Sequence, residues 1–177
     1  MKRIGVFLSS KNNLPAAYRQ AALDVGSWIG RTGRTLVYGG SRLGLMEELA
    51  TAVRQNGGHV IGVVPQAIMD RNLVSEQCDT TFFTAGLHDR KATMMRESEV
   101  LVALPGGIGT LDEVFTVLAA RTLEHYPRRV VLYNAGGCWD GLLALLDGLC
   151  REGLVSGTAG DVVTVVDSVD ALERACQ

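Results

Sequence analysis

The chain has 177 residues, of which 47% are hydrophobic and 20% charged, and its formal net charge at pH 7 is −2. A chain of this length forms one domain with a sizeable core. The small net charge excludes the broad basic surface that nucleic-acid binding needs, although it leaves room for a local phosphate site. No apolar run approaches the roughly 18 residues of a membrane-spanning helix.

Cysteines and histidines show no pattern of a disulfide framework or a metal site. The cysteines are Cys78, Cys138, Cys150 and Cys176, and the histidines are His59, His88 and His125. Widely spaced cysteines without a Cys-x-x-Cys pair are typical of free thiols in a reducing compartment. The apolar run from Ile4 to Leu8 is too short for a signal peptide and has no small-residue cleavage site. We therefore expect a cytoplasmic protein without a bound metal.

Apolar runs alternate with helical patterns along the whole chain. The predicted strands are 4–8, 35–38, 59–64, 80–84, 100–104, 130–133 and 162–166. The predicted helices are 14–31, 45–55, 87–97, 111–124, 139–151 and 169–176. This alternation predicts an α/β fold, a Rossmann-like doubly wound parallel sheet of about seven strands with helices on both faces. No linker or repeat divides the chain, so residues 1–177 are expected to form a single domain.

Ligands of such sheets bind beyond the carboxyl ends of the strands. Four loops at that edge carry small or polar residues: 9–13, which includes Ser10, then 39–44, the turn at Pro65, and 105–113. Two glycine-rich turns at one edge are more than the topology needs. We therefore expect a ligand site there.

The turn from Gly39 to Gly44 nearly matches the dinucleotide fingerprint G-x-G-x-x-G, but Ser41 replaces the middle glycine. The acidic residue expected after the next strand is also missing, because that strand ends in Val63-Val64-Pro65. NAD binding is therefore disfavoured. The turn is either a tight strand–helix connection or the second wall of a mononucleotide pocket, with Gly39, Gly40 and Ser41 facing a phosphate.

Arg90 and Lys91 open the predicted helix 87–97. They bring two cations to the sheet edge, one of them a guanidinium suited to bidentate contacts with phosphate or carboxylate. A solvated, charged first helical turn is the alternative interpretation.

The sequence PGGIGTLDE runs from Pro105 to Glu113 and directly follows the apolar run 100–104. It is neither a Walker loop nor a dinucleotide turn. Thr110 and Glu113 have the spacing of a helix capping box, an alternative that requires no chemistry but leaves the glycines and Asp112 unexplained. We expect the glycine backbone at the helix start to hold a phosphate, with a carboxylate one turn along.

These motifs resemble those of the Lonely Guy family of phosphoribohydrolases, often mislabelled as lysine decarboxylases. PGGIGTLDE matches the family's PGGxGTxxE, and Arg90-Lys91 matches its R-K-x-x-M element. Tyr38-Gly39-Gly40 and Gly44-Leu45-Met46 match the family's YGGGxxGLMG turn. The similarity extends from residue 4 to about residue 150.

The resemblance implies hydrolysis of the N-glycosidic bond of a nucleoside 5′-monophosphate, either AMP or an N6-substituted, cytokinin-type AMP. The products are the free base and ribose 5-phosphate, and no cofactor is needed. Arg90 and Glu113 are then the catalytic pair. The expected substrate-binding residues are Ser10, Gly39, Gly40, Ser41, Glu76, Lys91, Gly106, Gly107, Ile108, Gly109, Thr110, Leu111 and Asp112.

The family resemblance also implies a homodimer or higher homo-oligomer with the site close to the subunit interface, and neither a nucleic-acid nor a membrane partner. A non-catalytic nucleotide or cofactor carrier that uses the same pocket is the alternative function. The Arg90/Glu113 pair favours the enzyme, because a carrier has no need of a carboxylate at the sugar.

The chain departs from the family pattern at several positions that bear on base preference. Ser41 and Glu47 replace glycines, Leu8-Ser9 replaces Cys-Gly, Ala119-Ala120 replaces Thr-Trp, and residues 123–129 replace LGxHxKP.

Overall fold

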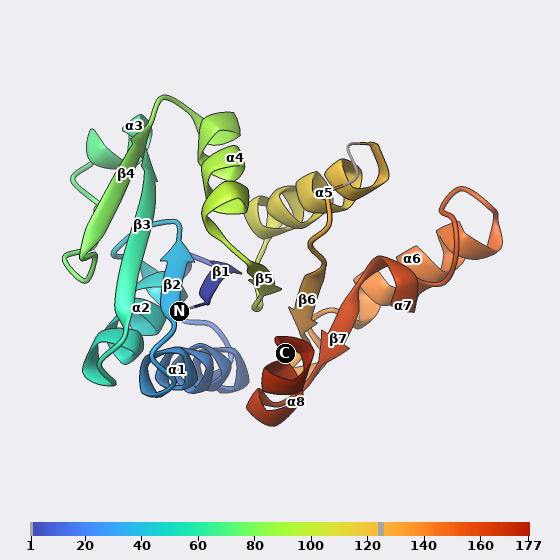
Figure 1. Ribbon diagram of the computed structural model, residues 1–177, viewed down its shortest axis with the longest axis horizontal. Helices are drawn as coiled ribbons and strands as arrows, with labels where there is room; N and C mark the ends of the chain where they lie inside the picture. Colours follow the sequence, from blue (N-terminus) through green and yellow to red (C-terminus); the bar gives the residue numbers. More distant parts are fainter. Residues whose placement is uncertain (1, 124–125) are drawn as a thin grey trace.

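A computed structural model describes residues 2–123 and 126–177. Within these residues, seven strands form one parallel sheet in the order β4-β3-β2-β1-β5-β6-β7 (Figure 1). The strands are β1 (Arg3–Phe7), β2 (Thr35–Tyr38), β3 (His59–Pro65), β4 (Thr80–Thr84), β5 (Val100–Ala103), β6 (Val130–Tyr133) and β7 (Thr164–Val166). The α/β fold with a parallel sheet of about seven strands is therefore confirmed.

Helices cover both faces of the sheet (Figure 1). They are α1 (Ala16–Arg31), α2 (Gly44–Gln55), α3 (Gln66–Met69), α4 (Leu87–Glu97), α5 (Ile108–Leu123), α6 (Asp140–Arg151), α7 (Ala159–Val162) and α8 (Val169–Ala175), with a 3-10 turn at Ala135–Gly137. Helices α1, α2 and α8 pack on one face, and α4, α5 and α6 pack on the other.

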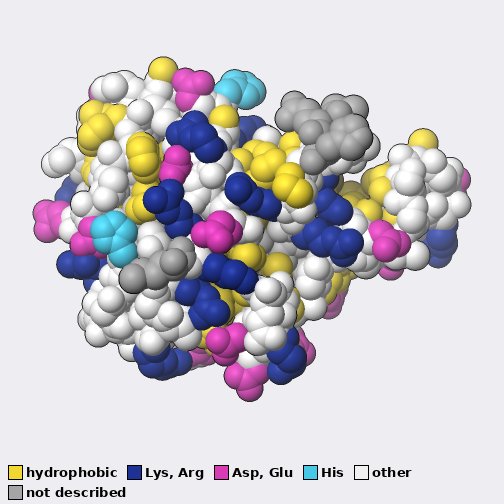
Figure 2. Space-filling model, viewed as in Figure 1, with side chains coloured by type: hydrophobic (Ala, Val, Ile, Leu, Met, Phe, Trp, Pro, Cys, Tyr) yellow, Lys and Arg dark blue, Asp and Glu magenta, His cyan; other side chains and the backbone are white. Residues whose placement is uncertain are grey.

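Each face of the sheet has its own hydrophobic core. One contains Val25 of α1, Leu49 of α2 and Leu172 of α8, and the other contains Met94 of α4 and Val117 of α5. Strands between two such layers are buried on both sides, which explains their continuous apolar runs. No described helix is both long and apolar enough to cross a membrane. On the face shown in Figure 2, basic and acidic side chains are interspersed, in keeping with the small net charge.

The predicted elements occur in the predicted order, with differences at some ends. Strand 162–166 is shorter than predicted, because residues 159–162 form helix α7. Thr158 and Asp161 form a capping box at the N-terminus of this helix. Helix 111–124 begins three residues earlier, at Ile108, and the predicted end at residue 124 lies outside the described residues. Residues 124 and 125 of the segment that departs from the family pattern also lie outside them.

The early start of α5 contradicts the capping-box alternative for Thr110 and Glu113. The amide of Leu111 already donates to the carbonyl of Gly107 (2.9 Å), so Thr110 lies inside the first turn and is not the N-cap. The carboxylate of Glu113 contacts Arg90 instead of the backbone of Thr110. This frees Glu113 for a role other than helix capping.

The sheet order places the reversal point of the fold at β1 and β5. From β1 the chain builds outward to β2, β3 and β4, returns through α4 to β5 on the other side of β1, and continues to β6 and β7. The loops after β1 and β5 are tied together, since the amide of Ser9 donates to the carbonyl of Pro105 (3.1 Å). Doubly wound sheets bind their ligands at this point, outside the carboxyl ends of the strands.

Candidate active site

A cleft of about 530 Å³ lies across the carboxyl ends of β1, β2 and β3 and the start of α5. Ser10 lines it from the loop after β1, Gly39 and Ser41 from the turn after β2, and Arg90 from α4. The segment from Gly107 to Thr110, together with Glu113, lines it from α5. Residues far apart in the sequence therefore meet in one cleft at the expected edge of the sheet.

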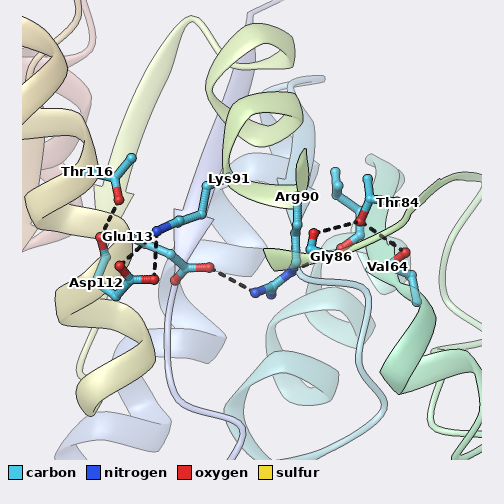
Figure 3. Close-up of polar contacts among 9 residues, drawn as sticks. Val64, Thr84, Gly86, Arg90, Lys91, Asp112, Glu113 and Thr116 are labelled. Carbon is cyan, nitrogen blue, oxygen red and sulfur yellow. Dashed lines mark hydrogen bonds and ion pairs between the residues drawn. The ribbon is translucent and has the colours of Figure 1, made fainter. Parts of the chain in front are cut away.

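Arg90 and Glu113 form a largely buried ion pair between α4 and α5. Nη1 of Arg90 lies 3.2 Å from Oε1 of Glu113, and the side chains are only 13% and 6% exposed. Nε of Arg90 donates to the carbonyl of Val63 (3.2 Å), so β3 and Glu113 both hold the guanidinium. Figure 3 shows the contact between Arg90 and Glu113. The pair presents one cation and one anion to the cleft at fixed positions.

Burial changes the protonation of Glu113. The loss of hydration, with a smaller contribution from the charge of Asp112, raises the pKa of its carboxyl group to about 7. Arg90 and Lys91 oppose this shift because they favour the carboxylate. A carboxyl group that titrates near neutral pH suits acid–base chemistry.

The start of α5 forms an anion site from backbone groups. The first amides of a helix have no acceptor within the helix, and the helix dipole favours an anion there. Gly107 and Gly109 have open space where a side chain would begin, so a ligand can approach their backbone closely. Gly106 differs, because a Cβ atom there would lie 2.0 Å from Oγ1 of Thr110. Its role is therefore to let Thr110 pack.

The glycine turn after β2 is shaped by the arginine. A Cβ atom on Gly39 would lie 1.9 Å from Nη2 of Arg90, so only glycine leaves room for the guanidinium. Gly40 has a positive φ of 67°, and its carbonyl accepts from the amide of Ser75 (2.9 Å). The turn thus supports the position of Arg90 and is itself fixed by the segment before β4.

Lys91 and Asp112 form a second ion pair beside the first. Nζ of Lys91 lies 2.8 and 2.9 Å from the two carboxylate oxygens of Asp112, and the Lys91 side chain is 11% exposed (Figure 3). Neither residue lines the cleft. The pair joins α4 to α5, and the alternative of a solvated first turn does not describe either Arg90 or Lys91.

The structure brings together part of the expected substrate-binding set. Those that line the cleft with Arg90 and Glu113 are Ser10, Gly39, Ser41, Gly107, Ile108, Gly109 and Thr110. Those that do not line it are Gly40, Glu76, Lys91, Gly106, Leu111 and Asp112. Glu76 is exposed on the loop before β4, Gly106 packs against Thr110 of the cleft wall, and Asp112 pairs with Lys91.

Sequence reasoning missed the apolar end of the cleft. It is lined by Leu43, Met46, Pro65, Ile68, Leu73 and Leu87, together with Arg71. Apolar residues at helix starts have the same pattern as core residues, so the sequence offers little signal for them. The one available signal is the turn at Pro65, since any loop after a strand of this sheet reaches the same edge.

Within the residues that the structure describes, no three His, Cys, Asp or Glu side chains gather as a metal site. The cleft combines an anion-binding helix start with a carboxyl group of raised pKa and a guanidinium.

Comparisons with known proteins agree with this geometry. Residues 46–176 match the family described as "Possible lysine decarboxylase". A probable cytokinin riboside 5′-monophosphate phosphoribohydrolase of Oryza sativa subsp. japonica is 38% identical over 171 residues, which cover 97% of this chain and 70% of the relative. A cytokinin riboside 5′-monophosphate phosphoribohydrolase of Arabidopsis thaliana is 37% identical over 173 residues, which cover 98% of this chain and 80% of the relative.

Among solved structures, the molybdenum cofactor carrier protein of Chlamydomonas reinhardtii is similar in fold. It has a TM-score of 0.74 and 26% sequence identity, and the match covers 98% of this chain and 94% of the carrier. The molybdenum cofactor binding protein of Rippkaea orientalis shares the fold with a TM-score of 0.70 at 20% identity, over 98% of this chain and 94% of that protein.

Proposed function

Because the chain belongs to the Lonely Guy family of phosphoribohydrolases, we propose that it hydrolyses the N-glycosidic bond of a nucleoside 5′-monophosphate. The substrate is AMP or an N6-substituted, cytokinin-type AMP, and the products are the free base and ribose 5-phosphate. The observation that carries this proposal is the buried Arg90–Glu113 pair beside the anion-binding start of α5.

The phosphate anchors the substrate at Gly107 to Thr110. This contact fixes the position of the ribose. Binding energy at the phosphate then lowers the barrier to cleavage of the glycosidic bond. The base then extends along the strand ends toward the apolar wall that includes Met46 and Ile68.

Glu113 acts at the ribose. Breaking the bond between ribose and base builds positive charge on the sugar, in an oxocarbenium-like transition state. The Glu113 carboxylate stabilises that charge and orients or deprotonates the attacking water. Arg90 keeps the carboxylate in place through its 3.2 Å contact and its bond to Val63.

A non-catalytic nucleotide or cofactor carrier remains the competing function, since molybdenum cofactor carriers share the fold. The position of Glu113 favours hydrolysis, because a carrier of an anionic ligand gains nothing from a buried carboxylate in its binding cleft. The carrier hypothesis predicts stoichiometric binding with no base released at any enzyme concentration.

Chromatographic detection of free base tests the proposal. The panel consists of AMP, isopentenyl-AMP, GMP, CMP and the corresponding nucleosides, so it reports both the reaction and the preferred base. Glu113→Ala and Arg90→Ala are each expected to lower the rate of base release at least about a hundredfold, since each removes part of the charge arrangement.

Matched variants control for the loss of a charge elsewhere. Glu152→Gln and Arg31→Ala change exposed residues of the C-terminal end of α6 and of α1, and they are expected to keep the wild-type rate. An unchanged rate in Glu113→Ala or in Arg90→Ala would remove the role proposed for that residue.

A further inference from the structure

Ser41 carries a buried hydroxyl that has no hydrogen-bond partner among the described residues. The residue is only 3% exposed, and it lines the cleft from the turn after β2. A buried hydroxyl without a partner is destabilising, so each one requires an explanation.

The turn does not need this hydroxyl for its own structure. Ser41 pairs with Val74 through the backbone, the amide of Arg42 donates to the carbonyl of Leu73 (2.9 Å), and the amide of Ser75 donates to Gly40 (2.9 Å). These contacts all use backbone groups, so the hydroxyl of Ser41 takes no part in holding the turn.

The order of the strands indicates which part of a nucleotide Ser41 faces. The proposed phosphate site is at the start of α5, which follows β5. In the sheet, β1 separates β5 from β2, so the turn after β2 lies across β1 from the phosphate site. Gly39, two residues before Ser41, packs against the guanidinium of Arg90. Ser41 thus lies on the side of the cleft that holds Arg90, with β1 between it and the proposed phosphate site.

Resting on the proposed function, we propose that the hydroxyl of Ser41 binds the ribose 2′-hydroxyl and makes this chain selective for ribonucleotides over 2′-deoxyribonucleotides. Serine has three staggered rotamers about its Cα–Cβ bond, and the proposed contact requires the one that turns Oγ from its buried position toward the cleft. Both hydroxyls donate and accept hydrogen bonds, so they are a matched pair. The binding of a ribonucleotide then supplies the partner that Oγ lacks.

The 2′-carbon is bonded to the carbon at which the glycosidic bond breaks. Hydrogen bonds to the neighbouring hydroxyl of a sugar strengthen in the transition state of glycoside hydrolysis. The contact of Ser41 therefore affects kcat as well as KM.

The test compares wild type, Ser41→Ala and Ser41→Gly on AMP and on 2′-deoxy-AMP. Both variants are expected to lower kcat/KM for AMP about tenfold and to change it less than about twofold for 2′-deoxy-AMP, the size of one hydrogen bond. The ratio of variant to wild type is taken for each substrate separately, because the two glycosidic bonds differ in intrinsic lability. Equal losses on both substrates, or no loss on either, would overturn the proposal.

Ser10→Ala is the matched control, since it removes another serine hydroxyl from the same cleft. It is expected to affect AMP and 2′-deoxy-AMP to the same extent. A larger effect on AMP than on 2′-deoxy-AMP would assign the ribose contact to Ser10 and contradict the proposal for Ser41.

Calorimetric titration separates this proposal from the proposed reaction. AMP and 2′-deoxy-AMP are titrated into Glu113→Gln and into Glu113→Gln with Ser41→Ala. If Glu113→Gln binds AMP more tightly than 2′-deoxy-AMP, and the double variant binds the two equally, the role of Ser41 is supported even if wild type releases no base. Equal affinities of both nucleotides for Glu113→Gln overturn it even if wild type hydrolyses AMP.

Discussion

At the scale of single residues, the protonation of Glu113 links the cleft to a measurable property. Its ordinary pKa of 4.5 is raised to about 7, first of all by burial. Below pH 7 the carboxyl group is therefore mostly neutral, and above it mostly ionised. The proposed chemistry needs the ionised form, because only a carboxylate stabilises positive charge on the ribose.

We predict that kcat/KM for AMP falls about tenfold per pH unit below pH 7 and levels off above it. The phosphate of the substrate titrates near pH 6 and contributes to the same fall of kcat/KM at acidic pH. The kcat profile at saturating AMP separates the two, because it reports groups of the complex. A flat profile between pH 5 and 8 would contradict an ionised Glu113 as the acting group.

At the scale of elements, the end of β2 sets the position of Arg90 on α4. Gly39→Ala would put a Cβ atom 1.9 Å from Nη2 of Arg90, and the end of a flexible side chain moves more easily than backbone. We predict that this variant folds with nearly wild-type stability but loses at least about tenfold in base release, since Arg90 leaves Glu113. Thermal unfolding and the base-release assay measure the two effects.

Gly141→Ala is the control for Gly39→Ala. Gly141 lies in α6 with open space around it, so a methyl group there meets nothing. Wild-type activity in Gly39→Ala, or a large loss of stability, would contradict the packing argument.

The glycines before and within α5 are expected to differ in their tolerance of a side chain. Gly106→Ala is predicted to destabilise the protein, because its Cβ atom collides with buried Thr110. Gly109→Ala meets open space inside the helix, and it is predicted to stabilise the fold by up to about 1 kcal/mol, the helix preference of alanine over glycine. Chemical denaturation measures both, and the reverse order would contradict the assigned roles.

The elements were predictable from the sequence because buried parallel strands and amphipathic helices have distinct periods. The residue at which α5 begins was not predictable in this way. Ile108 is 82% exposed and lies between glycines, so nothing in the local pattern distinguishes a helix start at Ile108 from one at Leu111. Helix α7 was missed for a related reason, since four residues are too few to show a helical period.

The cleft was predictable only in part. Its polar residues could be predicted from the glycine-rich motifs and from Arg90, but Lys91 and Asp112 were expected in the site and instead pair beside it. Adjacent residues of a helix point in different directions, so Arg90 pairs with Glu113 in the cleft while Lys91 pairs with Asp112 outside it. The spacing of residues along the chain does not distinguish these two directions, because it does not show which elements pack against the helix.

At the scale of the whole molecule, α5 carries the proposed catalytic carboxylate and an exposed apolar surface. Phe115 is 40% exposed and lines a groove of about 500 Å³ between α5 and α6, together with Leu154, which is 75% exposed. We predict a homodimer that covers this surface, since contiguous apolar patches of this kind mark interaction sites.

Light scattering is expected to give about twice the chain mass of 18.9 kDa. Phe115→Glu is expected to yield the monomer, because the interface would bury its charge. Phe83→Glu changes a more exposed aromatic, on edge strand β4, and is expected to leave the dimer intact. A monomeric wild type, or dissociation by Phe83→Glu alone, would contradict an interface at α5.

The most direct test of the account is the product formed from AMP. Wild type and Glu113→Gln are incubated with AMP at catalytic and at stoichiometric enzyme concentrations, and adenine and ribose 5-phosphate are separated by chromatography. We predict repeated turnover to equal amounts of adenine and ribose 5-phosphate by wild type, and a rate at least about a hundredfold lower for Glu113→Gln. Tight binding of AMP by wild type with no adenine released at either concentration would contradict the hydrolase and favour a carrier.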